Sequence, residues 1–280
     1  MLGDGMIIVI DALNKHRFGP VLKAMHRLRA RVFRDRLGWD VTVIDDMEHD
    51  LFDNLHPAHV VCLDEDGDVV GCMRLLQTTG PHMLADVFAD ILDGEPPLRS
   101  ARLWEATRFC VDTAKLGGGK ARNSISYITS EVMIGAFEYA QKAGVLDAIA
   151  VIDPVMNRVL QRSGNAPYDY VGSTKQMGKV RAMAALMDCS DKRIAGIRAF
   201  AGIKHDVFAS EEAVLLQFNP QVAPRAVANP AKQVGDLHAY FAEQLQAADS
   251  QTEMDAVHRL MNEIRDKLPP GPQKLPQTLH

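Results

Sequence analysis

One stretch constrains the fold of this chain more than any other: the run from Arg102 to Asp112, Arg-Leu-Trp-Glu-Ala-Thr-Arg-Phe-Cys-Val-Asp. Its bulky and apolar residues, with no helix breaker among them, predict a β-strand. Glu105 and Arg108 interrupt the apolar run, and strict alternation would place them on opposite faces of the sheet. A β-bulge between them would bring both charges to one face, and bulges are common beside active sites. The run therefore predicts either a bulged strand at a reactive site or an ordinary surface strand that carries two charges.

The composition sets limits on the class of protein. The 280 residues, 47% of them hydrophobic, can bury one substantial core and a smaller appendage, and the net charge of −5 argues against nucleic-acid binding. Four cysteines lie in separate apolar runs without CxxC spacing, which predicts reduced core thiols in a cytoplasmic protein. We expect no secretion signal, because the start lacks a basic n-region followed by an apolar h-region, and no membrane span, because no window holds 18 apolar residues.

The hydrophobic periodicity elsewhere predicts alternating strands and helices. Strands are expected at 6–11, 58–63, 69–76, 146–152, 168–171 and 180–187. Helices are expected at about 18–37, 83–92, 124–143 and 154–162. Asp153 and Pro154 favour the start of the last of these helices, as N-cap and first helical residue. The order predicts an α/β (α+β) sandwich with helices packed on a central sheet.

Acidic and histidine side chains crowd the irregular segment 39–56. A calcium loop is a poor match because the central glycine is missing, and we expect no metal site. A plain acidic loop and a ligand-binding loop both remain open from the residues alone. Arg74 is a second unusual feature, a charge inside the apolar run of the strand at 69–76.

Eight of these charged and aromatic residues, taken in order, resemble the signature of the bacterial acyl-homoserine-lactone synthases, the LuxI-type autoinducer synthases. They are Arg29, Phe33, Trp39, Asp50, Asp53, Arg74, Glu105 and Arg108. The resemblance covers residues 6–205, and the family is similar in fold to the GNAT acyltransferases. It implies a central mixed sheet with a bulged, splayed central strand and helices on both faces. It also divides the chain into a synthase domain at 1–205 and a C-terminal extension at 206–280.

The resemblance implies a reaction between S-adenosylmethionine and a fatty acyl thioester. The amine attacks the thioester, and the carboxylate then closes a lactone and releases methylthioadenosine. Glu105 would act as general base with Arg108 keeping it ionised, while the other six signature residues would bind S-adenosylmethionine. S-adenosylmethionine is a substrate, so no separate cofactor is expected. The alternative for these charges is a structural ion-pair network.

The acyl chain needs an apolar pocket, and the central strand and the elements after it supply candidates. They are Leu103, Phe109, Val111, Met133, Phe137, Ile149, Val151 and Leu160, all of which could equally be core. Basic residues at 115–122 and 158–181 would dock an acyl carrier protein or the phosphates of acyl-CoA, and the sequence does not choose between these donors. Members of the family that make 3-oxo products often carry a threonine on the strand at 146–152. Ala150 and Ile152 have no hydroxyl there, which predicts an unsubstituted or unsaturated acyl chain.

The C-terminal extension predicts a linker at 219–230 followed by two amphipathic helices, the second opened by a capping box at Ser250. We expect this hairpin to dock on the body or to join two copies in a homodimer. Two other functions remain open: a GNAT-type N-acyltransferase that uses acyl-CoA, and a non-catalytic sensor of acyl groups or S-adenosylmethionine.

Overall fold

The computed structural model describes residues 6–117, 124–177 and 180–218, together with residues 254 and 258. A mixed seven-stranded sheet in the order β1-β4-β5-β6-β7-β9-β8 forms its centre. The strands are β1 (Ile7–Ile10), β4 (Ala58–Leu63), β5 (Val69–Gln77), β6 (Leu103–Val111), β7 (Asp147–Ile152), β8 (Asp169–Met177) and β9 (Val180–Asp188). All neighbours pair antiparallel except β6 and β7, which are parallel. The predicted mixed sheet is confirmed.

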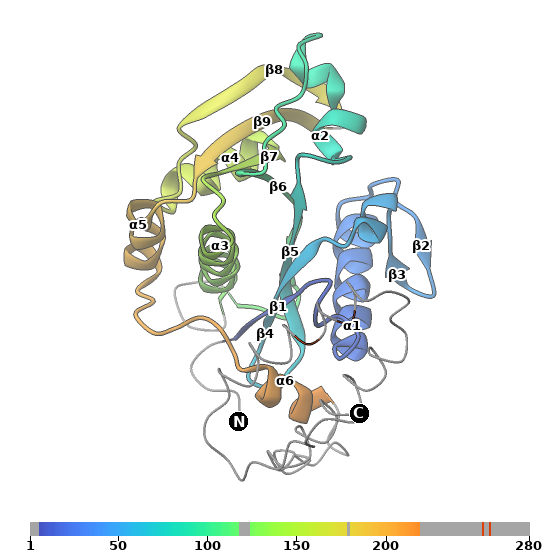
Figure 1. Cartoon of the computed structure of the whole chain (residues 1–280). Coiled ribbons are helices and arrows are strands. Elements are labelled where there is room, and N and C mark those ends of the chain that lie inside the picture. Colours follow the sequence, from blue (N-terminus) through green and yellow to red (C-terminus); the bar gives the residue numbers. More distant parts are fainter. Residues whose placement is uncertain (1–5, 118–123, 178–179, 219–253, 255–257, 259–280) are drawn as a thin grey trace. The chain divides into compact units, whose positions relative to one another are not determined.

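Helices cover both faces of the sheet (Figure 1). One face carries α1 (Gly19–Ala30), and the other carries α3 (Ile125–Lys142), against which α5 (Asp191–Ala201) packs. The remaining α-helices are α2 (Met83–Asp86), α4 (Pro154–Arg162) and α6 (Glu211–Phe218). A two-stranded ribbon of β2 (Val43–Ile44) and β3 (Met47–Glu48) lies beside α1. None of the helices among the described residues is long and apolar enough to cross a membrane.

The sequence explains where these helices begin and which of their faces is buried. Asp153 caps α4 by accepting a hydrogen bond from the Met156 N–H, and Pro154 follows it, as predicted. In α1, Val21, Met25 and Leu28 face the sheet at helical spacing. The helix predicted at 18–37 continues beyond α1 as the π-helical turns η1 (Arg31–Arg36). The segment predicted as one helix at 83–92 instead forms α2 and the separate 3₁₀ helix η3 (Ala89–Leu92).

The central strand β6 contains the predicted bulge. Cys72 pairs with Cys110 and Arg74 pairs with Thr107, so Arg108 and Phe109 together oppose Met73 alone. Arg108 has a φ of 51°, a left-handed conformation that arginine seldom adopts outside such irregularities. The extra residue changes the parity of the strand and brings Glu105 and Arg108 to the α1 side of the sheet.

The parallel ladder between β6 and β7 is short. Only Leu103, Trp104 and Glu105 pair with β7, through Asp147, Ala148 and Ile149. From Ala106 to Val111 the central strand has no partner in β7, so the sheet splays at the bulge. This combination of bulge and splay is the GNAT-like arrangement that the resemblance implied.

The body of the protein continues past residue 205. The described residues up to Phe218 all belong to one compact unit. Val207 and Val214, in the segment before residue 218, are fully buried, and Arg17 forms an ion pair with Glu211 of α6. The predicted linker at 219–230 and the first helix after it lie outside the described residues, as does the second helix apart from Met254 and His258, which are helical.

Two truncations should therefore differ sharply. Ending the chain after Phe218 should leave turnover per folded molecule nearly unchanged, because all eight signature residues and α6 are kept. Ending it after residue 205 removes Val207 and Val214 from the core, a loss of roughly 3 kcal/mol or more of stability. Urea unfolding and turnover of the two products check this, and an inactive but folded 1–218 protein would show that residues 219–280 take part in the chemistry.

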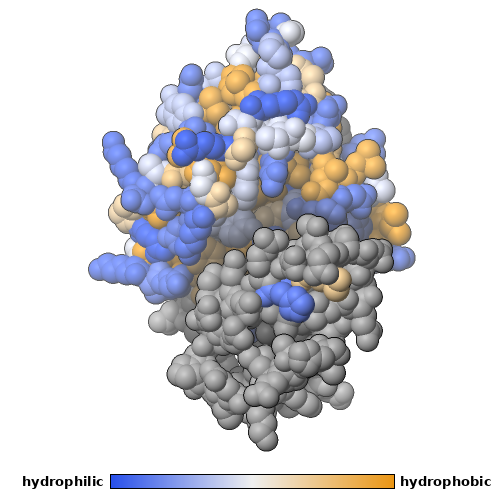
Figure 2. Space-filling model, in the orientation of Figure 1, coloured by the Kyte–Doolittle hydropathy of each residue, from blue (hydrophilic) through white to orange (hydrophobic). Residues whose placement is uncertain are grey.

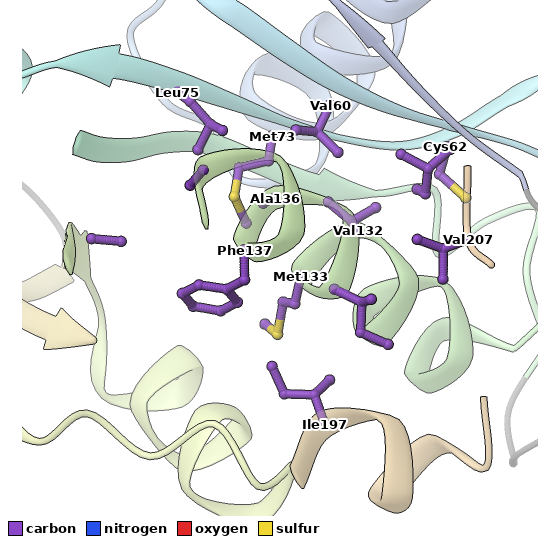
Figure 3. Close-up of a cluster of buried hydrophobic side chains, with 14 of the residues drawn as sticks. Val60, Cys62, Met73, Leu75, Val132, Met133, Ala136, Phe137, Ile197 and Val207 are labelled. Carbon is purple, nitrogen blue, oxygen red and sulfur yellow. The ribbon is translucent and has the colours of Figure 1, made fainter. Parts of the chain in front are cut away.

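The surface of the described part of the chain carries both hydrophilic and hydrophobic side chains (Figure 2). On the coloured part of the face in Figure 2, hydrophilic side chains surround several hydrophobic groups. The core is divided by the sheet, and Figure 3 shows the α3 side, where Val60, Met73 and Leu75 of the strands lie against Val132 and Ala136.

Candidate active site

Glu105 is fully buried on β6, just before the bulge. Its two carboxyl oxygens accept hydrogen bonds from backbone N–H groups at the start of α2, Met83 at 2.7 Å and Leu84 at 2.6 Å. Burial raises the pKa of Glu105 to about 7, because the two N–H groups and the Arg74 charge compensate only part of the cost of desolvation. A carboxyl group with this pKa can take up and release a proton near neutral pH.

Three arginines and three carboxylates form a buried network beside Glu105. Arg29 of α1 binds Glu48 of β3 at 2.5 Å and both oxygens of Asp53 at 2.8 and 2.9 Å. The side chains of Arg29, Arg74 and Glu48 are all fully buried. The segment after β3 carries Asp50 and Asp53 in a capping box at the start of the 3₁₀ helix η2 (Leu51–Leu55), which fixes the two aspartates.

Arg74 and Arg108 complete the network from the sheet side. Arg74 donates to Asp50 at 2.5 and 2.8 Å and to Asp53 at 2.8 Å. Arg108 donates to Glu48 at 3.1 Å and contacts Asp50 at 2.7 Å. Three positive charges thus balance three negative ones, and Glu105, when ionised, adds one surplus negative charge.

The arginines keep the network ionised. Burial alone would raise the pKa of Asp53, but hydrogen bonds from Arg29 and the charges of Arg29 and Arg74 outweigh it and hold that pKa well below its usual range. The same balance, with Arg74 and Arg108 as the cations, lowers the pKa of Asp50.

One expectation about the catalytic pair was wrong. Arg108 was expected to keep Glu105 ionised, yet among the ion pairs of the described residues none joins the two side chains. The left-handed backbone at Arg108 directs its guanidinium toward Glu48 and Asp50. Glu105 is held by backbone N–H groups instead, and its pKa is raised rather than lowered.

The two signature aromatics stack on each other beside the network. Their ring centroids lie 5.1 Å apart with an interplanar angle of 16°, and the Arg108 guanidinium lies 5.5 Å from the Phe33 centroid. Phe33 is buried, whereas 42% of Trp39 is exposed. Trp39 is therefore the ring that still has a face available for a ligand.

The eight candidate acyl-pocket residues fall into two clusters on opposite faces of the sheet. The larger group lies on the α3 side and consists of Phe109, Val111, Met133, Phe137 and Leu160. Figure 3 shows Met133 and Phe137 pointing from α3 toward Ile197 of α5. The other group, Leu103, Ile149 and Val151, packs with Leu84 and Ile91 on the opposite face. The structure does not bring all eight together, and none of them lines either of two surface cavities of about 480 and 380 Å³.

A cluster of His26, His49 and Asp53 has the residue types of a metal site, with ligand atoms within 4.8 Å of one another. Asp53 is already saturated, since one oxygen accepts from Arg29 and Arg74 and the other from Arg29 and the Asp50 N–H. His26 hydrogen-bonds the Glu48 carbonyl, and burial lowers its pKa to about 4. With no free carboxylate lone pair and Arg29 alongside, these residues do not fit a metal ion.

Two residues at the site were not predicted from sequence. Glu48 was expected only as one of the acidic side chains of the segment 39–56, and the two-residue strand that buries it has too little pattern to be detected. Met83 forms polar contacts through its sulfur and its backbone, and nothing in an apolar residue before a short helix indicates such a role.

Comparison with known proteins agrees with this geometry. The sequence model of the autoinducer synthase family matches residues 14–197. A probable acyl-homoserine-lactone synthase of Sinorhizobium fredii is 35% identical over 181 residues, which are 65% of this chain and 86% of that protein. Among solved structures, the CoA-dependent acyl-homoserine lactone synthase MesI is 27% identical with a TM-score of 0.62, over 72% of this chain and 97% of MesI. TofI in a ternary complex with an inhibitor and MTA is 26% identical with a TM-score of 0.57, over 69% of this chain and 96% of TofI.

The bulged, splayed mixed sheet has the GNAT-like fold of the acyl-homoserine-lactone synthases among the solved structures, which are acyltransferases. The chain belongs to the autoinducer synthase family, and its activity is that of an acyl-homoserine-lactone synthase. The resemblance drawn from the eight residues is confirmed.

Proposed function

We propose that this protein transfers an acyl group from a thioester to the amine of S-adenosylmethionine and then closes the lactone at this site. The observation that carries the proposal is the charge balance of the ion-pair network beside Glu105. Three arginines neutralise three carboxylates, so an ionised Glu105 leaves one negative charge. S-adenosylmethionine carries an ammonium, a sulfonium and a carboxylate, a net charge of +1, and complements it.

Glu105 serves as general base in the first step. The attacking amine must lose a proton, and a buried carboxylate whose pKa is about 7 takes it efficiently near neutral pH. The new amide bond forms as the thioester C–S bond breaks. The backbone of Ala106–Val111 on its β7 side has no strand partner, so N–H groups there are placed to stabilise the oxyanion.

The arginines and Trp39 serve the second step. Arg74 and Arg108 orient the substrate carboxylate, which displaces the sulfonium sulfur to close the ring and release methylthioadenosine. The exposed face of Trp39 holds the sulfonium by a cation–π contact. Arg29, Asp50 and Asp53 fix this arrangement from the α1 side, and MTA in the TofI complex is consistent with a product site in this fold.

The remaining assignments follow from the same chemistry. S-adenosylmethionine is consumed as a substrate, so the reaction needs no further cofactor. Acyl carrier protein and acyl-CoA both remain candidate donors, and the CoA dependence of MesI supports testing acyl-CoA first. All four cysteines are free and buried, and reduced thiols are typical of proteins in the reducing cytoplasm. Association into a homodimer through the C-terminal extension, residues 206–280, stays a prediction.

The product should carry an unsubstituted or unsaturated acyl chain. Ala150 and Ile152 of β7 are buried, and neither offers a hydroxyl to a 3-oxo group. A site without that donor cannot favour the 3-oxo substrate by this route. Turnover of matched acyl and 3-oxoacyl thioesters measures the preference, and faster 3-oxo turnover would refute it.

Mass spectrometry of extracts from cells that express the chain tests the proposed function. An acyl-homoserine lactone that is missing from cells with the empty vector would support it and identify the acyl length. Acylation of other amines without any lactone would favour a general GNAT-type N-acyltransferase. An extract with no new acyl product, from cells that contain folded protein, would favour a sensor.

A further inference from the structure

Met83 links the buried carboxylate to two of the arginines. Its sulfur lies 3.3 Å from Nη2 of Arg74 and 3.4 Å from Nη1 of Arg108, and both N–H groups donate to it. Its backbone N–H donates to Glu105 at 2.7 Å. The side chain is 6% exposed and packs with Phe52 and Leu76. One residue therefore contacts the general base and the two cations assigned to the substrate carboxylate.

The acceptors of Arg74 show what is unusual about this sulfur. Nη1 donates to Asp50 and Asp53, and Nη2 donates to Asp50 and to Met83. With Nε bound to Thr107, all five N–H groups of Arg74 are engaged. Among the acceptors of its two Nη groups, the thioether is the only uncharged one and the weakest.

We propose that Met83 is a positioning residue for the carboxylate of the amino-acid substrate, an inference that rests on the proposed function. Its sulfur makes one N–H of Arg74 and one of Arg108 converge on a single point without neutralising either cation. A carboxylate is a far stronger acceptor than a thioether and takes over these two N–H groups when it binds. A charged acceptor in place of the sulfur would compete with the substrate, and an aliphatic side chain would let the guanidiniums turn toward the neighbouring aspartates.

Two substitutions separate this role from simple packing. Met83→Leu keeps the apolar volume and removes the acceptor, whereas Met83→Gln keeps an uncharged acceptor. The matched control is Met187→Leu, because Met187 is also buried but lies on β9 and has no hydrogen bond to Arg74 or Arg108 among those of the described residues. Each protein is assayed for thiol release with S-adenosylmethionine and with its decarboxylated analogue, which retains the amine and the sulfonium but lacks the carboxylate.

We expect Met83→Leu to raise the KM for S-adenosylmethionine about fivefold, because guanidiniums that have turned toward the aspartates must turn back before the carboxylate binds, with kcat and the KM for the acyl donor nearly unchanged. The KM for the decarboxylated analogue should not change, and Met83→Gln should behave like the parent. A parental KM in Met83→Leu, an equal rise for both amines, or a Gln variant as impaired as the Leu variant would each overturn the inference. Lactone formation by the parent, recorded in the same assay, reports separately on the proposed function.

Discussion

Replacing Glu105 by glutamine is expected to lower the turnover of lactone by a factor of about 10² to 10⁴, the usual contribution of a general base. Glutamine keeps the shape of the side chain and one carbonyl acceptor for the N–H groups of Met83 and Leu84, but it cannot take a proton from the amine. In the parent, kcat/KM should rise with pH through an apparent pKa of about 7, because only the ionised carboxylate acts as base.

Thermal unfolding of the Glu105→Gln protein serves as the control, since the fold of α2 depends in part on this side chain. A folded variant that retains near-parental turnover would exclude Glu105 as the base. A parental kcat/KM that does not change between pH 6 and 8 would count against the same assignment.

Replacing Arg29 by alanine should have the largest effect on stability. The change removes the 2.5 Å ion pair with Glu48 and the two hydrogen bonds that Arg29 donates to Asp53. The side chains of Arg29 and Glu48 are both fully buried. Breaking a buried pair in this way costs about 3–5 kcal/mol, because the remaining charges stay buried without full compensation. Urea unfolding measures the loss.

Arg34→Ala on the same helical segment is the matched comparison. Arg34 pairs with Asp35 at the surface, so its removal should leave the unfolding midpoint unchanged. Equal midpoints for the Arg29 and Arg34 variants would mean that the network contributes nothing to the stability of the fold.

The sequence predicts a candidate site at these residues because they break local rules. Glu105, Arg108 and Arg74 are charges in strands that are otherwise apolar, and a bulge was the simplest way to bring two of them to one face. The pairing of Arg74 with Thr107 and of Cys72 with Cys110 confirms it. The family signature then added the residues of α1 and of the acidic segment.

Other features could not be predicted, for physical reasons. Apolar residues occupy both faces of β6 and β7, so sequence alone could not show that Leu103 and Val111 belong to different clusters. The π-helical turns at Arg31–Arg36 have no distinct sequence pattern. The partners of Arg108 depend on its left-handed backbone, which follows from the bulge and not from the identity of the residue.

The most direct test of the central claim is a single incubation of purified protein with S-adenosylmethionine and an acyl-CoA, followed by mass spectrometry. The account predicts acyl-homoserine lactone and methylthioadenosine in equal amounts, both falling at least 100-fold in the Glu105→Gln protein. Acyl-homoserine lactone formed at equal rates by the two proteins, or an acylated amine formed without methylthioadenosine, would contradict it.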